Sequence, residues 1–380
     1  MARKRGQNEG SIFQRESDGR WCGVISLGWE NGRRKRKHFY GVTVAAVQEQ
    51  LLKARSDHSR GLPVVIERQT VVQFLEHWRE QSLKPGAKPR SYESFSTIIE
   101  KHIAPELGRI RLDKLSPQQV QSLLNRKLKA GLSAQTVVNI RTVLRSALAQ
   151  ALKWGLVARN AAALVDPPRI VRPKAHALTA EQARVLLDTA REGRFEAIYV
   201  LALTLGMRRG EILGLSWSDV DLDNRALRVN QAVQRLKDGL KITELKTERS
   251  RRAIALPDGV VRVLKTRRTR QIQERLMAGL RWQSTGLVFT NPNGGPLEPI
   301  TLHRDYKKLL KASGLPEETR FHDLRHSAAS LLLAQGVQLR VIMELLGHSS
   351  IALTANTYSH VMPAAMRDVA DRMDAIFANA

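Results

Sequence analysis

The chain has 380 residues, of which 42% are hydrophobic, so it is long enough for two or three domains and too apolar to be disordered throughout. Lys and Arg total 62 against 36 Asp and Glu, and the resulting formal net charge of +26 at pH 7 favours a polyanionic partner such as nucleic acid. Cys22 is the single cysteine, which excludes an internal disulfide, and no apolar run reaches ~18 residues, so we expect a cytoplasmic protein that is neither secreted nor bound to a membrane.

The first sixty residues predict a small three-stranded sheet with one helix on a face. The expected strands cover residues 10–15, 21–29 and 33–40. Asp18-Gly19 and Asn31-Gly32 separate them, and both dipeptides are typical of hairpin turns because glycine adopts a positive φ without a Cβ clash. Apolar residues at helical spacing from Val44 to Leu52 then predict a helix.

The third predicted strand carries the densest basic run of the chain. Its residues are Arg33, Arg34, Lys35, Arg36 and Lys37. A solvated strand is one interpretation. Strand alternation, however, places Arg34 and Arg36 on one face and the other three on the opposite face, and so many like charges repel one another unless a polyanion meets one face. We therefore predict that this run contacts DNA.

Residues 68–165 predict an all-helical bundle of four or five helices. Thr70 and Ser116 each precede a glutamine by three residues, which is a capping-box sequence at a helix start. The adjacent prolines Pro167 and Pro168, followed by basic residues and Pro173, predict an extended linker over residues 166–176.

Residues 177–380 predict one larger, mostly helical unit with a small antiparallel sheet. Helices are expected over 183–190 and 195–205, strands over 225–236, 240–246 and 251–256, and helices again after a loop at 291–299. With an N-terminal unit over residues 1–62, the chain is predicted to be a multidomain α+β protein. Its last helix, which follows Tyr358, is too apolar for a free tail and packs either on its own domain or on a neighbouring subunit.

A histidine and an arginine lie at the start of a predicted helix in the sequence Phe-His-Asp-Leu-Arg-His. His322 and Arg325 are three residues apart and are expected opposite an apolar face that includes Leu324 and Ala328. A helix N-terminus also attracts anions, so this pair forms a candidate phosphate site. A capping histidine and a salt-bridged arginine are the structural alternative.

A second candidate phosphate ligand lies between glycines in Gly-Met-Arg-Arg-Gly-Glu. Arg208 follows a predicted apolar helix, and its guanidinium is a planar fork that matches two phosphate oxygens. A buried ion pair between Arg208 and Glu211 is the other interpretation. The two are compatible, because Glu211 can hold the arginine that faces the phosphate.

Two further residues, His348 and Tyr358, become candidate site residues only because they accompany the motifs above. Gly347 predicts a helix end, which places His348 in a turn. Tyr358 follows ten residues later, among polar neighbours and outside any apolar stripe. A lone tyrosine of this kind is usually an ordinary surface or interface residue.

Taken together, these motifs resemble the tyrosine recombinases of the phage integrase family. Arg208, His322, Arg325, His348 and Tyr358 stand in the order and approximate spacing of the family's catalytic residues. The resemblance also implies a catalytic lysine on a β-hairpin, and we assign it to Lys246, although Lys237 and Lys241 are near. Glu211 and His326 are expected to support the catalytic set. The first 60 residues are similar to the arm-site DNA-binding domain of lambda-type integrases, and residues 68–165 to their core-site domain.

The resemblance implies an enzyme that cleaves and rejoins DNA through a 3′-phosphotyrosyl link and a Holliday junction, without cofactor or metal. It further implies a homotetramer on core and arm attachment sites, near the nucleoid of a bacterial host, with possible help from DNA-bending and directionality proteins. The DNA that such an enzyme integrates or excises would be that of a phage or another mobile element. A non-catalytic DNA-binding regulator, a type IB topoisomerase and a metal-dependent nuclease using His322, His326, His348 and His360 remain the alternatives.

Overall fold

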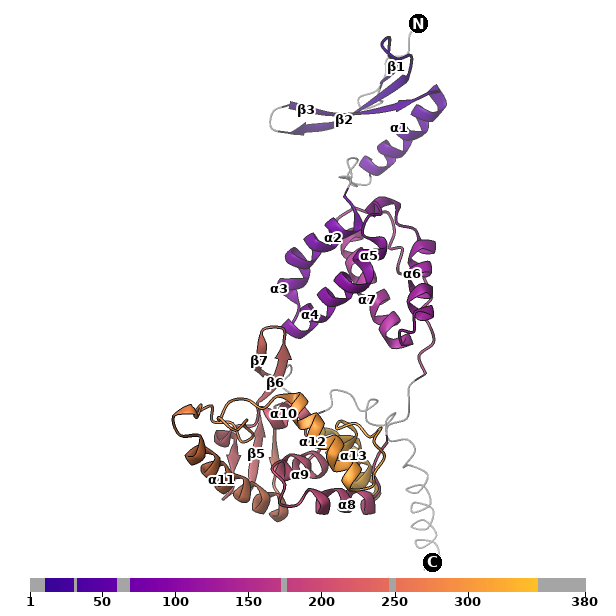
Figure 1. Cartoon of the computed structure of the whole chain (residues 1–380). Helices are drawn as coiled ribbons and strands as arrows, with labels where there is room; N and C mark the ends of the chain where they lie inside the picture. The colour runs from indigo at the N-terminus through magenta and orange to yellow at the C-terminus, as the bar shows by residue number, and fades with distance from the viewer. Residues whose placement is uncertain (1–10, 31–32, 60–68, 172–175, 246–250, 348–380) are drawn as a thin grey trace, which may run out of the picture. The chain divides into compact units, whose positions relative to one another are not determined.

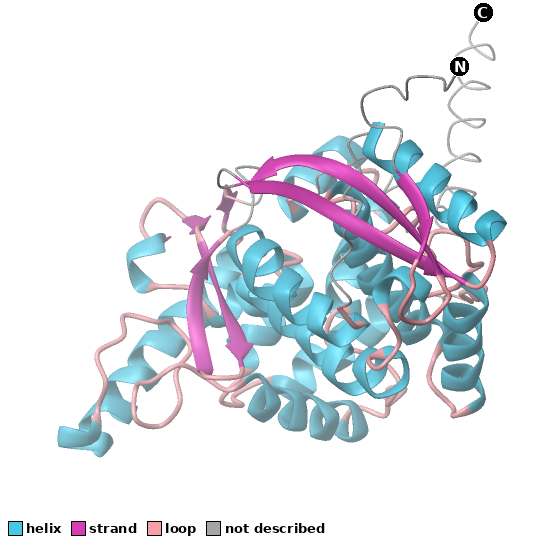
Figure 2. Cartoon of the chain, turned by 90° about the horizontal axis from the view of Figure 1, so that it is seen from above, coloured by secondary structure: helices cyan, strands magenta, loops and turns pink. Residues whose placement is uncertain are grey.

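A computed structural model describes residues 11–30, 33–59, 69–171, 176–245 and 251–347 (Figure 1). The chain divides into two compact units, Met1–Val171 and Arg172–Ala380, and each is described by itself. Helices predominate, and the strands form small antiparallel sheets (Figure 2), as predicted from the sequence. The finer boundaries expected at residues 62–68 and 165–177 stay predictions.

The chain begins with a three-stranded antiparallel sheet in the order β1-β2-β3. The strands are β1 (Ser11–Gln14), β2 (Trp21–Glu30) and β3 (Arg33–Gly41), and helix α1 spans Val44–Ser59. Val47 and Leu51 of α1 pack on Ile25 of β2 in a small core. A Cβ at Gly23 would lie 2.5 Å from Val47 Cγ1, so the absence of a side chain there allows α1 to approach the sheet closely.

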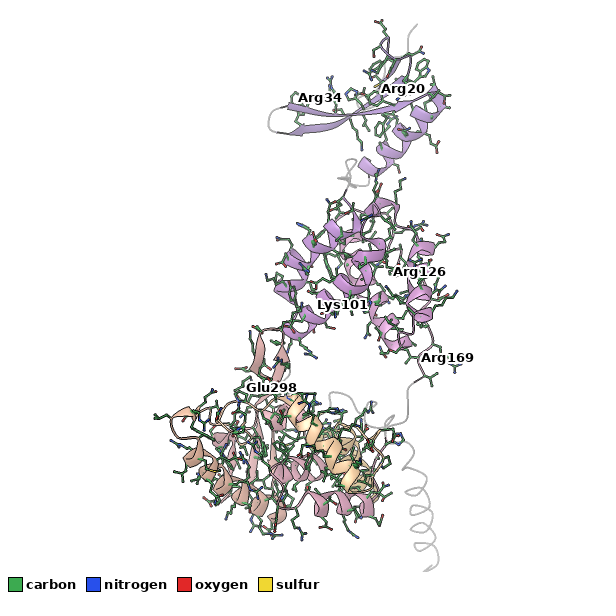
Figure 3. All side chains as sticks on the ribbon, viewed as in Figure 1. Arg20, Arg34, Lys101, Arg126, Arg169 and Glu298 are labelled. Carbon is green, nitrogen blue, oxygen red and sulfur yellow. The ribbon has the colours of Figure 1, made fainter. Side chains whose placement is uncertain are left out.

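The sheet face away from α1 is basic and aromatic. Arg34 and Arg36 are exposed on this face, as strand alternation predicts, and Arg34 donates from Nε to Ser26 Oγ at 3.0 Å (Figure 3). Lys37 lies on the opposite face, with Nζ 5.3 Å from the centroid of the Phe39 ring. The side chains of Arg33 and Lys35, and the Asn31-Gly32 turn, lie outside what the structure describes.

Residues 70–153 form a helical bundle, as predicted. Its helical segments are α2 (Val71–Trp78), continued by a π-helical turn (Arg79–Leu83) and α3 (Lys84–Gly86), then α4 (Pro89–Ile98), continued by a π-helical turn (Ile99–Ile103) and α5 (Ala104–Leu107), then α6 (Pro117–Lys129) and α7 (Ala134–Lys153). Both predicted capping boxes form: the side chains of Thr70 and Ser116 accept from the backbone of the glutamine three residues on.

The second unit is built around α9, a short helix that is apolar on almost every side. The elements are α8 (Ala180–Ala190), α9 (Glu196–Thr204), α10 (Arg209–Leu213), β4 (Val220–Asp221), β5 (Ala226–Val229), β6 (Gln231–Leu236), β7 (Gly239–Glu244), β8 (Arg252–Ala255), α11 (Asp258–Ala278), α12 (Pro299–Ala312), α13 (Asp323–Ala334) and α14 (Leu339–Leu346). Helices α8, α11 and α13 pack around α9. Such a helix is stable only in a core.

The strand expected over residues 225–236 is in fact two strands that belong to different sheets. Strand β5 pairs with β4 and β8, whereas β6 pairs with β7 in a hairpin closed by Asp238-Gly239, as predicted. The break falls at Asn230, whose side chain donates to Asp219 Oδ1 at 2.8 Å and whose carbonyl accepts from Leu245 N. The continuous alternation of the sequence did not reveal this break, because it depends on partners distant in the chain.

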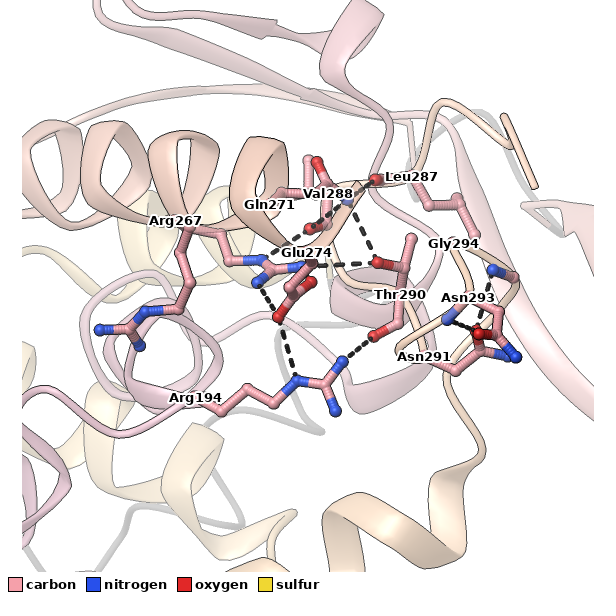
Figure 4. A network of polar contacts seen from close by, with 12 residues as sticks. Arg194, Arg267, Gln271, Glu274, Leu287, Val288, Thr290, Asn291, Asn293 and Gly294 are labelled. Atoms are coloured by element: carbon pink, nitrogen blue, oxygen red, sulfur yellow. Dashed lines mark hydrogen bonds and ion pairs between the residues drawn. The ribbon is translucent and has the colours of Figure 1, made fainter. Parts of the chain in front are cut away.

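A network of polar contacts fastens α11 to the loop over residues 285–291 (Figure 4). Arg267 is buried and donates to both carboxylate oxygens of Glu274, at 3.0 and 2.9 Å, and to the carbonyl of Val288 at 3.0 Å. Arg194 also donates to Glu274, at 3.2 Å. Buried charges are stable only when paired in this way, so the network fixes the outer helix of the core.

We predict that Gly214→Ala destabilises the second unit. Gly214 ends α10, and a Cβ there would lie 2.8 Å from Ala232 Cα and 2.9 Å from Val233 N, both backbone atoms of β6. The strand would have to move, so we expect a loss of about 1–3 kcal/mol in the free energy of unfolding, measured by urea titration.

The matched control is Gly259→Ala, because a Cβ at this position in α11 meets only the end of the Arg262 side chain at 3.8 Å. This variant should be as stable as the parent or more stable. Equal stability of the two variants would contradict the close approach of α10 to β6.

Candidate active site

A sharp turn between α9 and α10 brings the chain against the end of α14. Gly206 has φ +61°, and a Cβ there would lie 2.3 Å from Leu346 Cδ2. Glycine therefore satisfies both the backbone conformation and the close contact. Arg208 follows at the N-cap of α10, where its backbone N–H donates to Glu211 Oε2 at 3.0 Å.

Glu211 is a buried carboxylate shared by two arginines. Arg208 Nη1 donates to its Oε1 at 2.6 Å, and Arg252 Nη2 donates to its Oε2 at 2.9 Å. Burial alone would raise the pKa of Glu211, but the charges and hydrogen bonds of Arg252 and Arg208 outweigh burial and lower it. The predicted ion pair is therefore confirmed, and Glu211 fixes the direction of the Arg208 side chain.

Arg325 is buried, with 2% of its surface exposed, and does not lie on an open face opposite Leu324 and Ala328 as expected. Helix α13 is buried all round over its first two turns because α9 packs on one side and α14 on another. Arg325 Nη1 donates to the carbonyl of Gly206 and Nη2 to that of Leu346, both at 2.7 Å. These contacts set the guanidinium beside the Gly206 turn.

The C-terminal end of α14 is where the arginines meet. Arg325 binds the carbonyl of Leu346, and Arg208 Nη2 donates to that of Gly347 at 3.0 Å. Gly347 is left-handed, with φ 65° and ψ 49°, so it ends the helix as predicted. The described residues end here, one residue before His348.

Two histidines lie at the start of α13. The rings of His322 and His326 are 5.1 Å apart between centroids and nearly perpendicular. Although His322 keeps an exposed surface, partial burial, followed by the positive charges of His326, Arg325 and Arg208, lowers its pKa to about 4. Burial likewise lowers the pKa of His326. Both rings are therefore neutral at pH 7, so His322 has an unprotonated ring nitrogen that can accept a hydrogen bond.

Asp323 is a second buried carboxylate that the motif analysis did not assign. It accepts from the backbone N of Arg320 at 2.8 Å and from two side-chain nitrogens of the same residue. The charges and hydrogen bonds of Arg320 hold the pKa of Asp323 below its usual value against the effect of burial. This contact fixes the turn that presents His322.

Arg252 is another residue that motif analysis missed, although it lay within the predicted third strand of the sheet. A signal existed: Arg252 is two residues from Ile254, and alternation places both on the inward face of β8. An arginine on the inward face of a strand requires a buried partner. The identity of that partner, Glu211, was not readable because 41 residues separate the two.

The described part of the second unit thus brings together Arg208 and Glu211 at the start of α10 with His322, Arg325 and His326 at the start of α13, two distant segments of the chain. Lys246, His348, Tyr358 and the expected C-terminal helix lie outside the described residues. The basic run over residues 33–37 belongs to the other unit. No helix among the described segments is long and apolar enough to cross a membrane.

The second unit has the fold of the integrases, a class of DNA recombinases. Residues 176–364 match the phage integrase family and residues 70–128 match its N-terminal SAM-like domain. An integrase from Streptomyces ambofaciens is 32% identical over 391 aligned residues, which cover 99% of this chain and 98% of that relative. The chain therefore belongs to the phage integrase family.

Two solved structures share the fold. The Tn1549 transposon integrase in complex with a circular intermediate DNA matches with a TM-score of 0.66 at 22% identity, covering 79% of this chain and 99% of that one. A lambda integrase tetramer bound to a Holliday junction matches with a TM-score of 0.57 at 18% identity, covering 93% of this chain and 96% of that one.

We predict that His322 titrates near pH 4 in the folded protein, below the value of ~6.5 for an unperturbed histidine. Because the unfolded chain binds this proton more readily than the folded chain, His322 contributes stability above about pH 6.5 that is lost as the pH falls towards 4. Carbon NMR of histidine-labelled full-length protein measures the pKa, and His322→Gln assigns the signal. A pKa at or above 6.5 would contradict the burial of this ring and the positive charge around it.

Proposed function

We propose that the chain is a site-specific DNA recombinase of a phage or other mobile element, which cleaves and rejoins strands through a 3′-phosphotyrosyl intermediate and a Holliday junction. One observation carries the proposal: Arg208 and Arg325, from distant segments, bind adjacent carbonyls at the end of α14, immediately before the segment that contains His348 and Tyr358. Two guanidinium groups held side by side can donate to the non-bridging oxygens of a phosphodiester, and their charge matches the two negative charges present once a phenolate adds to phosphorus.

The arginines would act on the phosphate as its geometry changes. When a nucleophile adds to phosphorus, negative charge gathers on the non-bridging oxygens, and fixed donors there give the largest single rate effect. Arg208 and Arg325 are held by Glu211 and by backbone carbonyls before DNA arrives. His348 is proposed as a further donor to the same oxygens.

The covalent step exchanges one phosphoester bond for another. The Tyr358 hydroxyl loses its proton to His322, the phenolate oxygen bonds to phosphorus, and the bond from phosphorus to the 5′-oxygen breaks. Lys246 gives the proton that the departing 5′-hydroxyl needs. The bond energy stays in the phosphotyrosyl link, so a partner strand's 5′-hydroxyl can reverse the step without ATP.

We infer that the DNA partners are duplex core sites for the helical bundle and the second unit, and arm sites for the N-terminal sheet. The solved lambda integrase is a tetramer on a Holliday junction, and on that basis we propose a homotetramer for this chain. Accessory DNA-bending and directionality proteins, and a location at the bacterial nucleoid, belong to the same proposal.

The experiment that tests the proposal is Tyr358→Phe on nicked core-site DNA. The substitution removes one oxygen and keeps the ring, so DNA affinity should survive while covalent protein–DNA adducts disappear. The parent protein should form adducts equally well in excess chelator. Adducts formed by the Phe variant, or mapped to another residue, would overturn the assignment of Tyr358; a chelator requirement would favour a nuclease, and plasmid relaxation without strand exchange a topoisomerase.

We also predict that Arg34 and Arg36 bind arm DNA. Both are exposed on the face of the sheet opposite α1, with Tyr40 on the same strand. The double variant Arg34→Gln/Arg36→Gln should weaken arm-site binding and flatten its salt dependence, because each lost phosphate contact lowers the slope of log affinity against log salt by about one. Fluorescence anisotropy at a series of salt concentrations measures both quantities.

The control is Arg55→Gln, which removes one exposed arginine from α1 rather than from the outer sheet face. Core-site cleavage should be unchanged in both variants. An equal salt slope for the parent and the Arg34→Gln/Arg36→Gln protein would contradict the assignment of this face.

A further inference from the structure

Three consecutive carbonyls at the end of α14 each accept a hydrogen bond from a different arginine. The carbonyl of Leu345 accepts from Arg252 Nε at 2.6 Å. The carbonyl of Leu346 accepts from Arg325, and that of Gly347 accepts from Arg208. The last carbonyls of a helix have no partner within the helix, and its dipole favours positive charge there. Two of these arginines are the proposed phosphate ligands. The third, Arg252, is not one of these ligands.

Arg252 connects this helix end to the carboxylate that directs Arg208. Its side chain is 7% exposed, and Nη2 donates to Glu211 Oε2 at 2.9 Å. The same oxygen accepts from the backbone N–H of Arg208. Strand β8 thus supplies one side chain that contacts both the start of α10, through Glu211, and the end of α14, through Leu345.

Because two arginines share the Glu211 carboxylate, this sharing determines the orientation of the Arg208 side chain. A buried carboxylate must be compensated, because an unpaired charge in a core costs several kcal/mol. While Arg252 binds Oε2, the side chain of Arg208 compensates only Oε1. If Arg252 were removed, the carboxylate would draw the guanidinium of Arg208 across both of its oxygens, away from the direction in which a phosphate would be bound.

We propose that Arg252 is a positioning residue of the phosphate site: it holds Glu211 so that Arg208 faces the DNA, and it holds the end of α14 from which the chain continues to His348 and Tyr358. It need not contact the DNA itself. This inference rests on the proposed function of the site. A displacement of a reacting or binding group by about 1 Å can cost ~100-fold in rate, so a residue of this kind affects cleavage without being a ligand of the phosphate.

The test compares Arg252→Gln and Arg252→Lys in the full-length protein. The readout is the single-turnover rate of adduct formation on nicked core-site DNA at saturating protein, with DNA affinity measured in parallel. We expect Arg252→Gln to slow adduct formation by about 10–100-fold with affinity within about threefold. Arg252→Lys should recover part of the rate, because an ammonium can compensate Glu211 but cannot bind Leu345 in the same fork geometry.

A double variant separates positioning from general stabilisation. Glu211→Gln/Arg252→Gln removes both charges, so no buried carboxylate remains to pull Arg208 aside. We expect it to form adducts faster than Arg252→Gln alone. The rate is measured per folded molecule. If Arg252 served only to stabilise the fold, Arg252→Gln would already keep the parent rate per folded molecule and the double variant would change only the folded fraction, and that result would overturn the proposal.

The chain offers a matched control in Arg267→Gln. The side chain of Arg267 is 4% exposed, against 7% for Arg252. It binds one carboxylate and one backbone carbonyl, those of Glu274 and Val288, which are not residues of the proposed site (Figure 4). It should lower thermal stability but leave the adduct rate per folded molecule unchanged.

The outcomes distinguish this inference from the function on which it rests. If the parent forms no adduct, the proposed function itself fails. If the parent forms adducts and Arg252→Gln matches its rate, the positioning role is wrong. If affinity and rate fall together in Arg252→Gln, Arg252 is a DNA-binding residue and the proposal is likewise overturned. If Arg252→Gln does not fold, the rate of Arg252→Lys relative to Arg267→Gln decides: a tenfold deficit supports positioning, and equality contradicts it.

Discussion

The second unit depends on holding three guanidinium groups close together before any DNA is bound. Arg208, Arg252 and Arg325 repel one another, and taking such charges out of water costs several kcal/mol each. The fold offsets this cost with the Glu211 carboxylate and with backbone carbonyls from the Gly206 turn and the end of α14. In a site built this way, most donors are fixed in advance and a phosphate supplies further negative charge.

This requirement accounts for much of the surrounding architecture. Helix α9 must be apolar on almost all sides because it carries the Gly206 turn through the middle of the core. Helix α13 is buried over its first turns because Arg325 has to reach that turn from the other side. The sheet brings Arg252 to the same place, and the network around Glu274 fastens α11 behind it. Burial, together with the positive charge of the cluster, keeps the histidines beside it neutral.

Local signals allowed much of this to be predicted from the sequence. Hairpin dipeptides, capping boxes and apolar periodicity identified the strands and helices, and the spacing of Arg208 and Glu211 predicted their ion pair. The burial of Arg325, the break at Asn230 and the role of Arg252 were not predictable, because each depends on partners 11 to 119 residues away. The backbone carbonyls that bind the arginines cannot be identified from the sequence, because every residue has a backbone carbonyl.

We propose that the arginines act by compensating negative charge on the scissile phosphate. A core site whose scissile phosphate is replaced by a neutral methylphosphonate tests it most directly, with Arg325→Ala and Arg208→Ala compared with the parent. On ordinary DNA we expect each variant to form adducts ~10²–10³ times more slowly than the parent. On methylphosphonate DNA the difference from the parent should shrink at least tenfold. An unchanged difference on both substrates would show that the arginines do not act on the charge of the phosphate.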